Sequence, residues 1–183
     1  MVIRKFLLSI AVLGVASMAS ALTSVLTLRS SAIQKGKTIP LEQVFNGSGC
    51  TGQNISPDLE WSGAPKNTKS FAITVFDPDA PTGSGWWHWI VFNIPANVNR
   101  LARGAGSGKA QLPEGAIQSR NDYGQIGYGG PCPPPGKPHR YIFTVYALKD
   151  KLPLDAQASG AMVGFQLNHL KLAVGRLQAR FGR

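Results

Sequence analysis

The stretch from Val75 to Pro81, Val-Phe-Asp-Pro-Asp-Ala-Pro, constrains the fold more than any other part of the chain. It ends a run, residues 70–76, whose alternating apolar side chains predict a half-buried strand. Asp77 continues the inward face of that strand, and a carboxylate is costly to bury unless a donor reaches it. Pro78 and Pro81 end the strand because proline lacks an amide hydrogen and fixes φ. The pattern predicts a strand that ends in a carboxylate at the rim of the core.

A second strand follows a short loop later and brings a histidine to the same region. Residues 89–94 have the composition of a strand, and strict alternation places His88 on one face with Ile90, Phe92 and Ile94. Because both side chains then stand at strand ends and face inward, we expect Asp77 and His88 to meet.

The clearest strand pattern covers residues 139–148, where His139 and Tyr141 share one face with the apolar residues behind them. Residues 97–138, which precede it, contain 9 Gly and 6 Pro and no clear period. A connection of that length inside a compact domain is usually functional. Its glycines allow backbone N–H groups to approach a ligand closely.

The remaining elements are expected toward the two ends of the chain. The patterns predict an N-terminal strand within residues 22–41 with a turn at Gly36, short strands at 38–44 and 59–62, a helix over 157–172 capped by Asp155 or Ser159, and a closing strand at 177–181.

The first 21 residues have the composition of a secretory signal peptide. A basic pair at positions 4 and 5 precedes the apolar residues 6–15, and Ala19-Ser20-Ala21 provides the small residues of a cleavage site. We expect cleavage after Ala21, which leaves residues 22–183 as one domain in the periplasm or outside the cell.

The alternative to cleavage is a retained membrane-spanning segment, because no charged residue occurs over positions 6–28.

The net charge bears on the partners of the mature chain. Removal of the first 21 residues leaves 17 Lys and Arg against 9 Asp and Glu, a formal charge of about +8. The cations are scattered and do not alternate with aromatic residues. We therefore expect no nucleic acid partner and at most peripheral contact with a membrane.

Two groups of motifs resemble the signature regions of the phosphatidylethanolamine-binding protein family. They are residues 77–81 with Trp87-His88-Trp89, and residues 130–134 with 136–141. Residues 54–61 resemble the segment that precedes them in the bacterial, Raf-kinase-inhibitor-like members. The resemblance implies an all-β fold with peripheral helices: a β-sandwich with a small anion pocket at one end.

The resemblance also implies which residues line that pocket. By their positions in the motifs, they are Asp77, Pro81, His88, Gly130, His139 and Tyr141, with Tyr128 as a further wall.

The chemistry of these groups suits a small anion. Imidazole and hydroxyl groups donate to phosphate or carboxylate oxygens, and a glycine leaves backbone amides within reach. Asp77 would repel an anion, so we expect it to orient a histidine or to accept from a ligand ammonium group. A phosphoethanolamine head group carries both charges and fits this set. The alternative is a polar cluster with a structural role alone.

The expected function is therefore non-catalytic binding of a small anionic ligand, such as phosphate or a phospholipid head group, without a cofactor. Asp77, Asp79, His88 and His139 are metal-ligand types, but they lack the spacing of a metal-binding motif. No serine lies in a nucleophile turn. Because the family includes kinase and protease inhibitors, the alternative is an inhibitor that binds a protein partner through the Gly/Pro-rich loops.

The chain has two cysteines, Cys50 and Cys132. In an exported protein such a pair is expected to form a disulfide. The bond would close a loop of about 83 residues, worth roughly 4–5 kcal/mol in the chain-entropy model. It would join the loop at Asn46 to the proline-rich turn. The alternative is two buried thiols.

Overall fold

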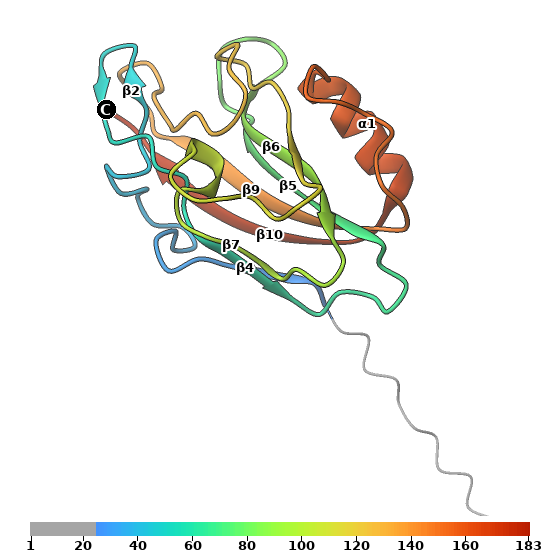
Figure 1. Ribbon diagram of the computed structural model, residues 1–183. Helices are drawn as coiled ribbons and strands as arrows, with labels where there is room; N and C mark the ends of the chain where they lie inside the picture. Colours follow the sequence, from blue (N-terminus) through green and yellow to red (C-terminus); the bar gives the residue numbers. More distant parts are fainter. Residues whose placement is uncertain (1–24) are drawn as a thin grey trace, which may run out of the picture.

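The computed structural model describes residues 25–183 (Figure 1), so the signal peptide predicted for residues 1–21 lies outside the described part. The described elements are β1 (Thr27–Arg29), β2 (Asn46–Gly47), β3 (Cys50–Thr51), β4 (Leu59–Ser62), β5 (Ser70–Asp77), β6 (Trp86–Pro95), β7 (Arg100–Leu101), the 3-10 turn η1 (Ala105–Ser107), β8 (Ile117–Gln118), β9 (His139–Leu148), α1 (Gly160–Leu170) and β10 (Lys171–Phe181).

The strands form two main sheets that lie against each other. A five-stranded antiparallel sheet has the order β10-β9-β5-β6-β8, and a three-stranded sheet has the order β1-β4-β7. Figure 1 shows α1 on one face of the larger sheet and β4 and β7 on the other. The all-β fold with a peripheral helix is therefore confirmed. In residues 25–183, no helix is long and apolar enough to cross a bilayer.

The two faces of the larger sheet bury separate apolar clusters. Between the sheets, alternate residues of β5 such as Ile73 pack with Trp61 of the small sheet. On the other face, Ile90 and Phe92 of β6 pack beneath Val163 of α1. Burial on both faces explains why β5 and β9 are almost continuously apolar, since only a strand covered on both sides needs no polar face.

Two irregularities in the β5–β6 pairing turn the faces of β6. At the first, three steps along β6, from Ile94 to Val91, match two steps along β5. At the second, the two steps from Trp89 to Trp87 match one step along β5, so His88 is the extra residue. Such a bulge reorients the side chains on either side of it.

The bulges overturn the alternation predicted from the sequence. Ile94 packs between the sheets, whereas Ile90 and Phe92 pack under α1. The alternate residues that were predicted to share one face with His88 therefore lie on two faces. The inward position of His88 was predicted correctly for the wrong reason: the bulge, and not a regular alternation, brings it to the end of the sheet where Asp77 lies.

The predicted strand at 38–44 was also wrong. Thr38 makes only an isolated bridge with Arg180, and the following segment is a turn in which Gln43 N donates to the Pro40 carbonyl oxygen at 3.0 Å. The predicted helix is shorter than expected and begins at Gly160, with the Ser159 hydroxyl as its cap. The closing strand, β10, begins at residue 171 and not at 177 because its whole length pairs with β9.

A disulfide joins Cys50 of β3 to Cys132 of the proline-rich segment, 82 residues later. It fastens the β2–β3 hairpin to a long irregular loop that has few strand hydrogen bonds of its own. The bond therefore constrains a part of the chain that a sheet does not hold.

We predict that the double variant Cys50→Ser/Cys132→Ser loses about 2–4 kcal/mol of unfolding free energy, because removal of the crosslink frees the unfolded chain. Urea unfolding followed by tryptophan fluorescence measures the loss. Reduced wild-type protein is the matched control and should unfold at nearly the same urea concentration as the variant. A midpoint equal to that of the oxidised wild type would contradict the prediction.

The contact of α1 with Trp87 gives a second prediction, on two glycines of the same helix. A Cβ at Gly160 would lie 2.4 Å from Trp87 Cδ1, whereas one at Gly164 would make an ordinary contact at 3.7 Å. The Trp87 ring packs against Phe76, with ring centroids 4.7 Å apart, so a shift of Trp87 would disturb this contact. Gly160→Ala should destabilise the fold by about 1–3 kcal/mol, and Gly164→Ala should be neutral or stabilising by up to about 1 kcal/mol. Thermal unfolding of the pair checks this, and equal effects at both positions would refute it.

Candidate functional site

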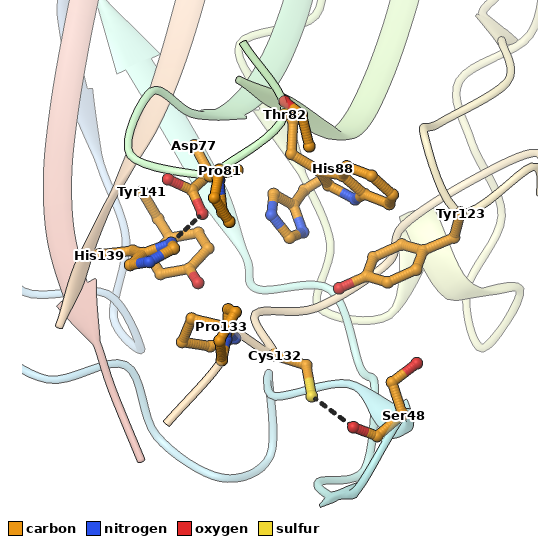
Figure 2. A pocket seen from close by; sticks show the side chains of 13 residues that line it. Ser48, Asp77, Pro81, Thr82, His88, Tyr123, Cys132, Pro133, His139 and Tyr141 are labelled. Atoms are coloured by element: carbon orange, nitrogen blue, oxygen red, sulfur yellow. Dashed lines mark hydrogen bonds and ion pairs between the residues drawn. The ribbon is translucent and has the colours of Figure 1, made fainter. Parts of the chain in front are cut away.

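A cavity of about 260 Å³ opens at the end of the larger sheet, where β5 ends and β6 and β9 begin (Figure 2). The strand ends supply Asp77, Trp86, His88, His139 and Tyr141. Loops complete the wall with Ser48, Ala80, Pro81, Thr82, Tyr123 and residues 132–134. The cavity therefore combines three neighbouring strand ends with loops that are distant in sequence.

Asp77 is the most deeply buried charged group of the cavity, with 2% of its surface exposed. Its Oδ2 accepts from Nδ1 of His139 at 2.7 Å, and its Oδ1 accepts from the backbone amide of Asp79 at 2.8 Å. These two donors provide the compensation that a buried carboxylate needs. The sequence pattern predicted that Asp77 would meet His88, but its hydrogen-bond partner is His139.

His88 is held in a different way. Its ring is 3% exposed, and Nδ1 lies 2.7 Å from the carbonyl oxygen of Gly129. A carbonyl oxygen only accepts, so Nδ1 carries the hydrogen and Nε2 of the neutral ring keeps its lone pair. Burial lowers the pKa of the His88 imidazole to about 4, although the carbonyl of Gly129 and the charge of Asp77 act in the opposite direction. The ring is therefore neutral near pH 7.

Two other polar groups of the cavity residues make no hydrogen bond of normal geometry within residues 25–183. They are the hydroxyl of Tyr141 and Nε1 of Trp86. Figure 2 shows the Tyr141 hydroxyl directed toward the cavity. Burial raises the pKa of Tyr141, so its oxygen keeps its proton. Both atoms are covered by neighbouring groups, so a ligand oxygen reaches them only if those groups move.

Tyr128, predicted as a wall of the cavity, lies in the core. Its side chain is 4% exposed, and its hydroxyl donates to the Gln43 carbonyl oxygen at 2.8 Å. Tyr123 forms the wall in its place. The Tyr123 ring stacks on Phe45 with centroids 4.2 Å apart, and its hydroxyl donates to the Gly130 carbonyl oxygen at 3.0 Å.

Gly130 lies behind the cavity wall. Its amide, expected to remain available to a ligand, already donates to Asn54 Oδ1 at 2.7 Å. A Cβ at this position would lie 2.1 Å from the Gln43 carbonyl oxygen. The close approach of two backbone segments, and not contact with a ligand, therefore requires glycine here.

The loop after β5 is clamped to β9 by an ion pair between Asp79 and Arg140. Asp79 accepts from Nε and Nη2 of Arg140 at 2.9 and 2.7 Å and from the Arg140 amide at 2.8 Å. The Arg140 guanidinium lowers the pKa of the Asp79 carboxyl to about 2. This clamp fixes Pro81 and Thr82, which line the cavity.

Several residues that line the cavity were not predicted as site residues, among them Ser48, Thr82, Trp86 and Tyr123. Trp86 and Thr82 flank the motif residues that the sequence analysis selected, and their proximity was the available signal. Tyr123 lies in an irregular segment whose path no periodicity predicts. No Lys or Arg lines the cavity. Within the described chain, no three His, Cys, Asp or Glu side chains gather in a way that would hold a metal ion.

Comparisons with known proteins agree with this geometry. The profile described as "Phosphatidylethanolamine-binding protein" matches residues 29–182. The chain is 53% identical over 161 residues to UPF0098 protein YbcL of Escherichia coli, covering 86% of this chain and 88% of YbcL. It is 50% identical over 155 residues to UPF0098 protein YbhB of E. coli, covering 84% and 98%.

The structural comparison leads to the same family. The crystal structure of E. coli YbcL, described as a new member of the mammalian PEBP family, superimposes with a TM-score of 0.84 at 52% identity and covers 86% of this chain and 98% of that one. The motifs at residues 77–81 and 136–141 lie within the matched region, and they supply the buried Asp77–His139 pair of the cavity. The chain belongs to the phosphatidylethanolamine-binding protein family.

Proposed function

We propose that the cavity binds a small phosphorylated anion, a phosphate or a phosphoethanolamine head group, and that the protein acts by binding and not by catalysis. Family members are generally binding proteins, which supports the coarser half of this proposal. The observation that carries the finer half is the Tyr141 hydroxyl, a buried donor that makes no hydrogen bond of normal geometry within the described chain, beside the Asp77–His139 pair.

The energetics of these donors favour an oxyanion. A buried donor without an acceptor costs on the order of 1–3 kcal/mol. An oxygen-rich anion would remove this cost, since its oxygens accept from several directions at once. His139 keeps Nδ1 on Asp77 and can take a second proton on Nε2 without breaking that bond, which would make it a cationic donor. The cavity volume of about 260 Å³ suits a small head group and is below the usual range for drug-sized ligands.

The arrangement offers no counterpart of a catalytic nucleophile. Ser48 lines the cavity but has no histidine that activates it among the described hydrogen bonds. Both cavity histidines use Nδ1 in fixed bonds to neighbouring groups. These contacts support binding as the activity.

We also propose that the protein is exported. The Cys50–Cys132 disulfide supports this, because such bonds persist in oxidising compartments. The net positive charge would attract the exported protein weakly to anionic surfaces. We therefore propose that any contact with a membrane is peripheral.

The export proposal predicts that protein recovered from the periplasm of a Gram-negative host begins at Leu22, because the signal peptidase recognises small residues before the cleavage site. Intact-mass analysis and N-terminal sequencing measure this. An Ala19→Arg/Ala21→Arg variant is the matched control and should remain uncut. Protein that keeps residue 1 and stays in the membrane fraction would contradict the prediction.

For the binding proposal, calorimetric titration of the mature protein with phosphoethanolamine should give saturable binding. Tyr141→Phe removes only a hydroxyl that makes no hydrogen bond of normal geometry in the protein, so it should leave the fold intact and weaken binding about twofold to tenfold. His139→Ala removes a donor that can carry charge and should weaken binding roughly tenfold to a hundredfold.

The matched control for both variants is His169→Ala, since His169 is an exposed histidine of α1 far from the cavity residues in sequence. It should bind like the wild type, and a neutral sugar should not bind to any form. Absence of phosphoethanolamine binding at millimolar concentration would refute the proposal and favour a protein partner on the Gly/Pro-rich loops.

A further inference from the structure

The two histidines of the cavity present different chemistry to a ligand. Nδ1 of His139 donates to a carboxylate, whereas Nδ1 of His88 donates to the uncharged carbonyl oxygen of Gly129. The His88 ring stands edge-to-face between Tyr141 and Tyr123, with ring centroids 5.1 and 5.6 Å away. Figure 2 shows this ring directed into the cavity. Its Nε2, without hydrogen, is therefore an acceptor beside donors such as the Tyr141 hydroxyl.

We propose, on the basis of the proposed anion site, that the cavity selects oxyanions that carry a proton: a phosphate monoester or inorganic phosphate, whose P–OH donates to Nε2 of His88. Sulfate esters and phosphodiesters have no such hydrogen near neutral pH. With these ligands an oxygen would face the His88 lone pair, and acceptor against acceptor is unfavourable.

The charges of the cavity lead to the same ligand. Asp77 contributes a negative charge, its partner His139 can carry a balancing charge only when it is protonated, and no Lys or Arg is present in the lining. Such a lining cannot neutralise a dianion. Adding a proton to a phosphate monoester lowers its charge from two to one and also supplies the donor that His88 needs. Charge and hydrogen bonding therefore favour the same protonation state.

Burial, and not the charge of its neighbours, keeps the His88 ring neutral in the relevant pH range. The groups that face the ring are Asp77 of β5, His139 and Tyr141 of β9, Tyr123, and the backbone of Gly129 and Gly130, whose hydrogen bonds favour the charged ring. Asp77 favours the charged ring and His139 opposes it, while both tyrosines stay neutral because burial raises their pKa. Burial outweighs these effects and lowers the pKa of His88 to about 4, so Nε2 keeps its lone pair above pH 5.

The first test compares methyl phosphate with methyl sulfate by calorimetry at pH 6. The monoanions have the same size and charge and differ by one proton. A phosphate monoester has its second pKa at about 6, so half of it is monoanionic at this pH. We expect methyl phosphate to bind roughly tenfold to a hundredfold more tightly, the effect of one hydrogen bond to a buried acceptor.

Raising the pH to 8 adds a second criterion. The affinity for methyl phosphate should fall by up to about fiftyfold, because its monoanion decreases from about one half of the ligand at pH 6 to about one hundredth at pH 8. Methyl sulfate has no proton to lose and reports only the titration of the protein. A fall of the same size for both ligands would overturn the proposal.

The His88→Gln variant tests the residue itself. An amide can turn its NH₂ toward the ligand, so methyl sulfate should gain affinity and approach methyl phosphate. Nitrogen-15 NMR of the histidine rings in wild-type protein gives an answer that does not depend on the folding of a variant. In the methyl phosphate complex, His88 should remain neutral with hydrogen on Nδ1; an imidazolium signal for His88 would overturn the proposal.

The outcomes separate this inference from the proposed anion site. Equal binding of both ligands, lost in His139→Ala, would leave the anion site standing and refute selection by the proton. Absence of binding by either ligand would refute both.

Two further ligands distinguish the sources of a phosphoryl group. Short-chain phosphatidic acid is a lipid monoester, and short-chain phosphatidylethanolamine is a diester. We expect the first to compete with methyl phosphate and the second to compete at least tenfold more weakly. Equal competition by both would overturn the proposal.

Discussion

The structure of the site depends on the burial of one carboxylate. Asp77 lies at the end of the central strand, almost without solvent contact, and a buried charge of this kind is tolerated only when donors surround it. The two donors come from different places: His139 begins β9, and the Asp79 amide belongs to the loop that follows β5. Removing one partner of such a pair generally costs about 3–5 kcal/mol. The carboxylate thus ties two neighbouring strand ends and a loop into one arrangement and fixes the floor of the cavity.

That constraint has a consequence for the histidines. Since Asp77 engages His139, it does not bond to His88, which bonds instead to an uncharged carbonyl oxygen. Two residues of the same type thereby acquire opposite capacities: one beside a carboxylate can become a cationic donor, and one in an apolar environment stays a neutral acceptor. The identity of the Nδ1 partner, and not the residue type, decides what each ring offers to a ligand.

The sequence predicted the parts of the fold that follow from regular patterns. The strands at residues 70–77 and 139–148 were recognisable because each keeps an unbroken inward face, and the motifs selected Asp77, His88, His139 and Tyr141. The bulge at His88 could not be predicted, because it depends on the register of two strands. The exchange of Tyr128 for Tyr123 follows from the path of an irregular loop, which hydrogen bonds to distant segments determine. Sequence patterns selected the groups, and tertiary contacts decided which of them meet.

The contrast between the whole protein and its cavity points to how such a site works. The chain is strongly basic, with a formal charge of +10, yet no Lys or Arg lines the cavity. Distributed surface charge attracts anions over long range but does not distinguish among them. Discrimination requires fixed donors and acceptors in a rigid frame, because a mobile frame would adapt to the wrong ligand. Here the frame is held by the Asp79–Arg140 clamp on one side and by the Cys50–Cys132 disulfide on the other. If the proposed anion site is correct, attraction and selection are divided between the surface and the cavity, and the cavity needs no permanent positive charge.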